Sequence, residues 1–207
     1  MQTPPEIAAF YDEGLEVSRL SRGLGRLEFA RMQEIVPRYF PPPPAAIADV
    51  GGGPGTYSCW LAAVGYAVHL VDPMPLHIAQ AEQASAQQPD HRILSCQLGD
   101  ARRVPLADAS VDAVLLHGPL YHLTTREDRL LALREALRVL RPGGVLFAVA
   151  ITAYASTIVG LVKGWVWDQD YLGMLREELL TGQHRRPANW RVLTTAYFHH
   201  PAGLAQE

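Results

Sequence analysis

Short apolar runs alternate with helical patterns along the middle of the chain, and most of the runs end in a polar or glycine-containing segment. The runs predict five strands, at residues 45–50, 66–71, 93–97, 111–116 and 145–151. Residues 56–64, 76–88 and 125–140 have helical spacing between them. Because parallel strands need crossover connections, this alternation predicts an α/β fold, a Rossmann-like, doubly wound and mainly parallel sheet covered by helices on both faces.

The last of these helices carries its own start and stop signals. Thr125 and Asp128 have the spacing of a capping box, in which a side-chain oxygen satisfies a free amide at the helix start. The segment Arg141-Pro142-Gly143-Gly144 places a cation and flexible glycines at the other end. The helix is therefore expected to stop there, just before the fifth strand.

Three regions follow from this pattern. Residues 4–38 have helical spacing, and the four prolines at 41–44 forbid a helix and begin a new unit. We expect an N-terminal helical cap at 1–40, a core at 45–152, and a lid or substrate region at 153–207. In that last region only 192–198 looks strand-like, so the fifth strand is expected to leave an open edge, through which two copies could pair as a homodimer.

Composition and charge narrow the class of protein. With 207 residues, 48% hydrophobic and 19% charged, the chain suits one globular domain with appendages. A net charge of −3 provides no positive field for nucleic acid, so no nucleic-acid partner is expected. The uncharged stretch 143–162 is long enough to span a membrane, but its polar residues favour a buried strand that runs into a turn, and no membrane partner is expected.

The N-terminal sequence and the two cysteines indicate in which cellular compartment the protein is expected. The first thirty residues carry acidic side chains, among them Glu6, Asp12, Glu13 and Glu16, and no long apolar stretch, which predicts no signal peptide and a cytoplasmic location. Cys59 and Cys96 are expected to be free, buried thiols, and they lack the spacing of metal ligands. No metal site is expected.

Polar residues collect where successive predicted strands end. They are Asp49, Asp72, Asp100 and His117. In open α/β sheets these ends line one ligand cleft. The turn after Asp49 has glycines at 51, 53 and 55, a G-x-G-x-G spacing, whereas dinucleotide sites favour G-x-G-x-x-G. Asp72 is placed to reach the hydroxyls of a ribose, which identifies a nucleoside without saying which one. Taken singly, each Asp could equally serve a loop or a helix cap.

Five motifs in order resemble those of class I S-adenosylmethionine (SAM)-dependent methyltransferases. They are Ile47-Ala48-Asp49-Val50-Gly51-Gly52-Gly53-Pro54-Gly55, His69-Leu70-Val71-Asp72, Gly99-Asp100-Ala101, Asp112-Ala113-Val114-Leu115-Leu116 and Leu140-Arg141-Pro142-Gly143-Gly144. The resemblance covers about residues 6–152. It implies the strand order 3-2-1-4-5, SAM as cofactor and S-adenosylhomocysteine as product. It also implies that two more strands, usual in the family, are incomplete here.

The resemblance also assigns roles along the cleft. The methionine part of SAM would be held by Asp49, Gly51 and Gly53, the ribose by Asp72, and the adenine by Pro73, Met74, Asp100 and Ala101. Apart from the resemblance, His117 is a candidate to line the cofactor or to contact the acceptor at the mouth of the pocket. Tyr11 and Arg31 of the cap are candidates to touch SAM, and Arg31 would pair with the carboxylate of SAM. The alternatives are ordinary packing for Tyr11 and an Arg31 side chain that faces solvent.

Methyl transfer to an acceptor needs alignment and exclusion of water, and needs a base only for a weakly acidic acceptor. His122 is the candidate catalytic base, because an imidazole titrates near neutral pH, although it could simply line the cofactor or cap a helix. Tyr121 and Trp165 are candidates for the substrate pocket, with helix packing as the alternative for Trp165. A small-molecule acceptor is expected.

Two other functions remain open from the sequence. One is a protein that binds SAM but is inactive or depends on a partner, which the short C-terminal region suggests. The other is an NAD-dependent oxidoreductase, which Asp72 suggests and the glycine spacing opposes.

Overall fold

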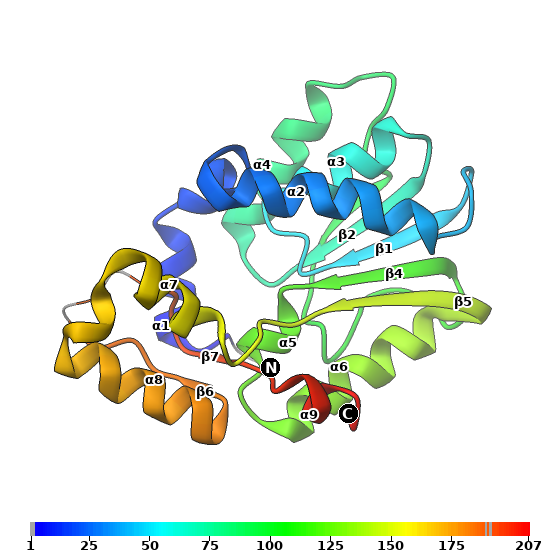
Figure 1. Ribbon diagram of the computed structural model, residues 1–207. Coiled ribbons are helices and arrows are strands. Elements are labelled where there is room, and N and C mark those ends of the chain that lie inside the picture. Colours follow the sequence, from blue (N-terminus) through cyan, green and yellow to red (C-terminus); the bar gives the residue numbers. More distant parts are fainter. Residues whose placement is uncertain (1–2, 189, 191) are drawn as a thin grey trace.

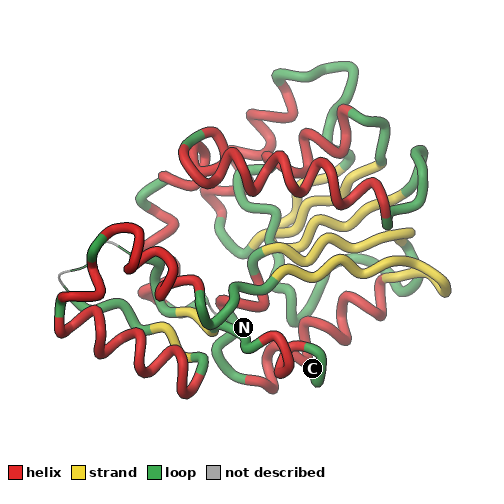
Figure 2. Tube along the Cα trace, viewed as in Figure 1, coloured by secondary structure: helices red, strands yellow, loops and turns green. Residues whose placement is uncertain are grey.

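The computed structural model describes residues 3–188, 190 and 192–207, and a parallel sheet runs through the middle of the protein (Figures 1 and 2). Its strands are β1 (Ala46–Val50), β2 (Ala67–Asp72), β3 (Ser95–Leu98), β4 (Val111–His117) and β5 (Leu140–Val149). They lie in the order β3-β2-β1-β4-β5, and each neighbouring pair is parallel. The predicted Rossmann-like fold and strand order are confirmed.

The central strands are apolar on both faces because helices cover both. Along β4, Ala113 and Leu115 belong to one buried cluster, while Val114 and Leu116 belong to the other. All four are fully buried. Successive side chains of a strand point to opposite faces, so a run without polar alternation is what a doubly covered strand requires.

Different helices cover the two faces (Figure 1). On one face lie α2 (Gly23–Ile35), α3 (Thr56–Ala63) and α4 (Pro75–Ala86), which contribute Met32, Tyr57, Leu61 and Ala81 to the buried cluster. On the other face lies α6 (Arg126–Val139), through Ala132, Ala136 and Val139. The cap helix α2 therefore packs on the core as an additional layer beside α3.

The start of α6 agrees with the sequence pattern and its end differs in detail. The side chain of Thr125 accepts a hydrogen bond from the backbone amide of Asp128 at 3.2 Å, as the capping box predicts. After Val139, however, the glycine-containing segment belongs to β5 itself. The register shifts there, because Leu140 pairs with Val111 and Val145 with Ala113. Gly143, at φ 82°, supplies the left-handed residue that this irregularity needs.

The predicted helical stretch at 4–38 is divided into four pieces. They are α1 (Pro5–Asp12), the 3₁₀ helix η1 (Leu15–Ser21), α2 and the 3₁₀ helix η2 (Val36–Arg38). Gly14, at φ 69°, breaks the chain between α1 and η1. As a result, α1 and η1 bend over the carboxyl ends of the strands instead of continuing the line of α2.

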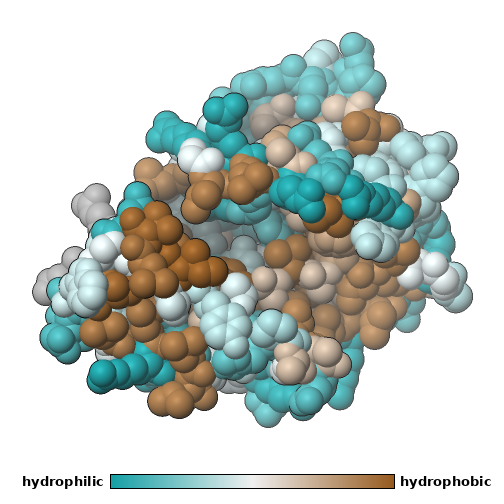
Figure 3. Space-filling model, in the orientation of Figure 1, coloured by the Kyte–Doolittle hydropathy of each residue, from teal (hydrophilic) through white to brown (hydrophobic). Residues whose placement is uncertain are grey.

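The C-terminal region forms its own small layer beside the sheet. It contains α7 (Ala155–Lys163), the 3₁₀ helix η3 (Trp165–Trp167), α8 (Gln169–Thr181), β6 (Gln183–His184), β7 (Ala196–Tyr197) and α9 (Pro201–Leu204). Apolar side chains gather on the outer face of α7, where Ile158, Leu161 and Val162 are exposed (Figure 3).

In the core, the short helix α5 (Pro119–His122) follows β4.

The strand predicted at 192–198 is correct only at Ala196–Tyr197. These two residues pair antiparallel with β6 and do not join the main sheet. Among the described residues, β4 is the strand that pairs with β5. Pairing of two copies through the other edge of β5 stays a prediction. In the described part of the chain, no helix has the length and apolar character needed to cross a membrane.

Candidate functional site

A cavity lies at the carboxyl ends of β1, β2, β3 and β4, beneath α1 and η1 of the cap. Most of the residues expected at the cofactor and acceptor sites line it: Tyr11, Gly51, Gly53, Asp72, Pro73, Met74, Asp100, Ala101, His117, Tyr121 and His122. Asp49, Arg31 and Trp165 do not. The crossover topology brings together side chains that lie far apart in the sequence.

The glycine turn between β1 and α3 forms one wall. Gly51, at φ 78°, donates its backbone amide to the carbonyl of Val71 at 2.8 Å. A Cβ added to Gly51 would lie 2.5 Å from Pro119, so only glycine fits between the turn and α5. Gly53, at φ 54°, has an open face toward the cap. The bare backbone therefore allows a ligand to approach closely.

Asp72, at the end of β2, is held by three donors. Its Oδ2 accepts the amide of Gly53 at 2.9 Å. Its Oδ1 accepts the amide of Met74 at 2.9 Å and Nδ1–H of His77 at 3.0 Å. The carboxylate is thus fixed in one orientation at the cavity wall. His77 was not singled out from the sequence, although its place in the first turn of the next helix is a signal that could have found it.

Asp49 lies behind the glycine turn, outside the cavity. It is fully buried, and its Oδ2 accepts the hydroxyl of Ser58 at 2.6 Å. Burial raises the pKa of this carboxyl to about 7, and the charge of Asp72 adds to the rise. The side chain of Asp49 turns toward Ser58 of α3, and its expected contact with the methionine part of the cofactor stays a prediction.

Asp100, at the end of β3, lines the cavity in a tight pair with Arg102. The guanidinium donates to the two carboxylate oxygens at 2.6 and 2.9 Å, and the Arg102 amide donates at 2.8 Å. Burial alone would raise the pKa of Asp100, but these bonds outweigh it and lower the pKa. Asp100 is therefore an ionised acceptor at the cavity wall.

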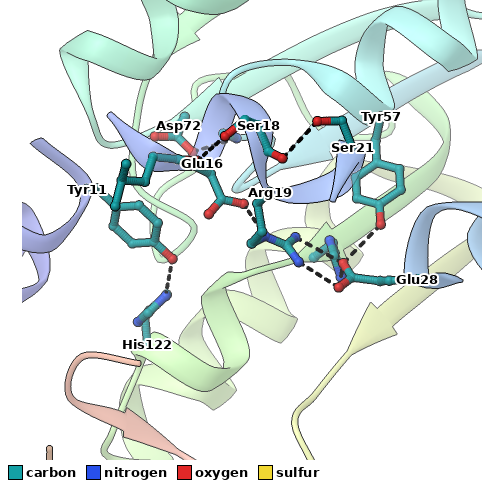
Figure 4. Close-up of polar contacts among 12 residues, drawn as sticks. Tyr11, Glu16, Ser18, Arg19, Ser21, Glu28, Tyr57, Asp72 and His122 are labelled. Carbon is teal, nitrogen blue, oxygen red and sulfur yellow. Dashed lines mark hydrogen bonds and ion pairs between the residues drawn. The ribbon is translucent and has the colours of Figure 1, made fainter. Parts of the chain in front are cut away.

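A cluster of charges joins the cap to the core (Figure 4). Arg19 of η1 donates two bonds to Glu28, at 2.6 and 3.0 Å, and one to Glu16 at 2.5 Å. Glu28 also accepts the hydroxyl of Tyr57 at 3.1 Å, and Nε2 of His117 lies 3.5 Å from it. Arg19 and Glu16 line the cavity, yet the helical pattern did not reveal them, because the break at Gly14 decides where they point.

Arg31 and Trp165 lie elsewhere. Arg31 is on the exposed side of α2, where it pairs with Glu34, because the neighbouring Met32 faces the core. Trp165 packs against Tyr171 and Trp190, with ring centroids 5.6 and 5.1 Å apart, inside the C-terminal layer. The cation that the cap places at the cavity is Arg19.

A cluster of aromatic side chains closes the other end of the cavity. The hydroxyl of Tyr11 is 2.6 Å from Nε2 of His122, and the Tyr11 ring stands edge-on to both His122 and His77. The ring of Tyr121 packs against the ring of His122, with centroids 4.8 Å apart. Burial lowers the pKa of His122, and separately that of His117, to about 4. Both imidazoles are therefore neutral at physiological pH.

A parallel sheet in this order, with a glycine turn after β1 and a fixed carboxylate after β2, defines a Rossmann-like nucleoside-binding protein. The protein belongs to the class I SAM-dependent methyltransferase family. Residues 48–148 match the family model described as "Methyltransferase domain".

Two curated relatives are similar over most of the core. A ubiquinone/menaquinone biosynthesis C-methyltransferase of Rubrivivax gelatinosus is 36% identical over 141 residues, covering 67% of this chain and 50% of that protein. A malonyl-[acyl-carrier protein] O-methyltransferase of Methylococcus capsulatus is 36% identical over 131 residues, covering 62% of this chain and 44% of that protein. The chain spans about half the length of these relatives.

Solved structures share the fold. A SAM-dependent methyltransferase from Methanosarcina mazei has a TM-score of 0.62 and 23% identity, covering 83% of this chain and 80% of that one. A protein from Pyrococcus horikoshii OT3 has a TM-score of 0.70 and 17% identity, covering 96% and 86%. The cofactor of this family is SAM.

The cavity fits that cofactor. It offers bare backbone at Gly51 to Gly53, carboxylates at Asp72 and Asp100, and a buried nitrogen without a hydrogen-bond partner among the described residues, Nε2 of His77. Such an atom is costly to leave unpaired, and a polar ligand would satisfy it. Across the described residues, no cluster of three or more His, Cys, Asp or Glu is arranged to hold a metal ion.

Proposed function

We propose that the protein transfers a methyl group from SAM to a small-molecule acceptor bound at the aromatic end of the cavity. One observation carries this proposal: the glycine turn, Asp72 and Asp100 share a single cavity with Tyr11, Tyr121 and His122. One end thus suits a nucleoside, and the other suits a second reactant close to it.

The residues have separate tasks in this proposal. The amides of the glycine turn and the carboxylates of Asp72 and Asp100 bind the cofactor, which supplies a methyl group on a sulfonium. Neutral His117 lines the cavity without adding a charge that would repel that sulfonium. The cap, held by Arg19, Glu28 and Tyr11, covers the cavity and keeps out water.

His122 and Tyr11 handle the proton of the acceptor. The hydroxyl oxygen of Tyr11 is 2.6 Å from Nε2, and in this proposal the hydroxyl donates to Nε2 while Nδ1 carries the imidazole proton. As the acceptor bonds to the methyl group, its proton passes to the oxygen of Tyr11, and the Tyr11 proton passes to Nε2 of His122. The products are the methylated acceptor, S-adenosylhomocysteine and an imidazolium. Because burial lowers the pKa of His122 to about 4, this pair is a weak base, which favours an acceptor that gives up its proton readily, such as an acidic enol or phenol.

The charges along the cavity favour an acceptor without a net negative charge. Both cations that line the described part of the cavity, Arg19 and Arg102, are already paired with carboxylates. Apolar side chains, among them Ile7 and Leu123, line the region around Tyr11 and His122. The relatives named above methylate on carbon and on oxygen, and either atom is compatible with this arrangement.

Calorimetry and turnover together test the proposal. Titration with S-adenosylhomocysteine should show binding with one site per chain, and Gly51→Val should abolish it, since the added side chain would collide with Pro119. Release of S-adenosylhomocysteine from SAM should then be measured with panels of quinols, phenols and carboxylic acids. Absence of binding by the folded wild-type protein would refute the proposal. Binding without turnover on any panel would instead leave a SAM-binding protein that depends on a partner.

A further inference from the structure

His77 lies against the carboxylate that is proposed to hold the ribose. It is the third residue of α4 and is 3% exposed. Its Nδ1 is 3.0 Å from Oδ1 of Asp72, and because an ionised carboxylate only accepts, Nδ1 carries the proton of this bond. The position of one ring nitrogen is therefore fixed by Asp72.

The other ring nitrogen has no such bond. Nε2 is buried and has no hydrogen-bond partner among the described residues, although His77 lines the cavity. With the proton on Nδ1, a neutral imidazole presents a lone pair at Nε2. The rings of Tyr11 and His77 stand edge to face, with their centroids 5.1 Å apart. Nε2 is thus a buried, unpaired acceptor on a residue that lines the cavity.

Asp72 has little accepting capacity left. A carboxylate offers about four lone-pair sites, and three are used by the amides of Gly53 and Met74 and by His77 itself. A ribose brings two neighbouring hydroxyls, each with a proton to donate. Asp72 can take one of them at Oδ2, so the second needs another acceptor nearby.

We propose that His77 is that second ribose-binding residue. Its Nδ1–H holds Asp72 in place, and its Nε2 accepts the ribose hydroxyl for which Asp72 has no site left. This inference rests on the proposed use of an adenosyl cofactor. It makes recognition of the ribose a task shared between a carboxylate on β2 and an imidazole on α4.

Two variants separate the two ring nitrogens. In His77→Asn the amide can still donate to Asp72 from near the position of Nδ1, but nothing replaces Nε2. In His77→Leu both bonds are lost. His69→Asn is the matched control, since His69 lies on β2, bonds to Ser95 at 2.8 Å and does not line the cavity.

The decisive measurement is the dissociation constant of each protein for S-adenosylhomocysteine and for its 2′-deoxy and 3′-deoxy analogues, by calorimetry. We expect His77→Asn to weaken binding of S-adenosylhomocysteine about tenfold, as loss of one buried hydrogen bond does, and His77→Leu to weaken it further. For the analogue that lacks the hydroxyl bound by Nε2, the wild type and His77→Asn should bind equally well. The control variant should match the wild type with all three ligands.

The outcomes separate this inference from the proposed function. If the wild type binds no S-adenosylhomocysteine, the proposed function fails. If the wild type binds it but His77→Asn loses the same factor with all three ligands, or loses nothing, only the role of His77 is overturned. Because the wild type is itself measured with both analogues, a variant that fails to fold does not end the test: a wild type that binds either deoxy analogue as tightly as the parent compound also contradicts the inference.

Discussion

The hydroxyl of Tyr11 lies 2.6 Å from Nε2 of His122, and this contact joins α1 of the cap to α5 beside the sheet across 111 positions of the chain (Figure 4). Both side chains line the cavity. The bond therefore links closure of the cap to the orientation of the proposed base.

Tyr11→Phe removes this bond and keeps the ring. We expect the free energy of unfolding to fall by about 1 kcal/mol, the usual net value of one hydrogen bond, and turnover to fall more than cofactor affinity does. Urea unfolding and steady-state kinetics check this. Tyr39→Phe, at an exposed ring, is the control. Unchanged kcat in Tyr11→Phe would remove Tyr11 from the proton path.

Arg19 and Arg31 are two arginines of the cap that lie in different surroundings, so substitutions at the two positions can be compared. Arg19 lines the cavity and bonds to Glu16 and Glu28, whereas Arg31 is on the outer side of α2. We expect Arg19→Met to weaken binding of S-adenosylhomocysteine about tenfold, because the cap over the cavity loses its charge-assisted bonds to Glu16 and Glu28. Arg31→Met should leave it unchanged. The reverse result would place the cofactor on the other side of α2.

Asp49 should make stability depend on pH. Burial raises its pKa to about 7, so between about pH 4 and 7 the folded protein holds a proton that the unfolded chain releases. Stability from this group is therefore present at acid pH and is lost as the pH rises toward 7.

Asp49→Asn has no charge to bury and keeps an acceptor for Ser58. The free energy of unfolding of the variant, relative to that of the wild type, should increase as the pH rises from 5 to 8. Urea unfolding at pH 5 and at pH 8 measures this difference. A difference that stays constant between the two pH values would contradict a raised pKa for Asp49. Asp108→Asn, at an exposed carboxylate, is the control.

Glu207 and Arg129 form a buried ion pair between α6 and the end of the chain, and the guanidinium also lies 3.7 Å from the centre of the Tyr197 ring. Removing one partner leaves the other charge buried, which costs about 3–5 kcal/mol. We expect Glu207→Gln to lower the free energy of unfolding by about that amount. Glu177→Gln, in the exposed pair with Arg185, should change it by about 1 kcal/mol or less. Equal effects would mean that the Arg129 pair is open to solvent.

The sequence alone was enough for the sheet, its order and most of the residues that line the cavity. Apolar runs such as 111–116 mark strands buried on both faces, and glycines at 51 and 53 mark a turn where no side chain fits. These are local requirements of the backbone, and the order of the motifs resembles that of the family. Asp72, Asp100 and His117 therefore lie where their positions at strand ends predict.

Only the tertiary structure decided which side chains turn toward the cavity. Asp72 is the last residue of β2, whereas Asp49 is the last but one of β1, and its side chain points at Ser58 of α3. Arg19 reaches the cavity and Arg31 does not, because the break at Gly14 sets the angle of η1, and the packing of Met32 sets the rotation of α2. Periodicity determines which residues share a face of a helix, but the direction of that face depends on how the separate elements pack against one another.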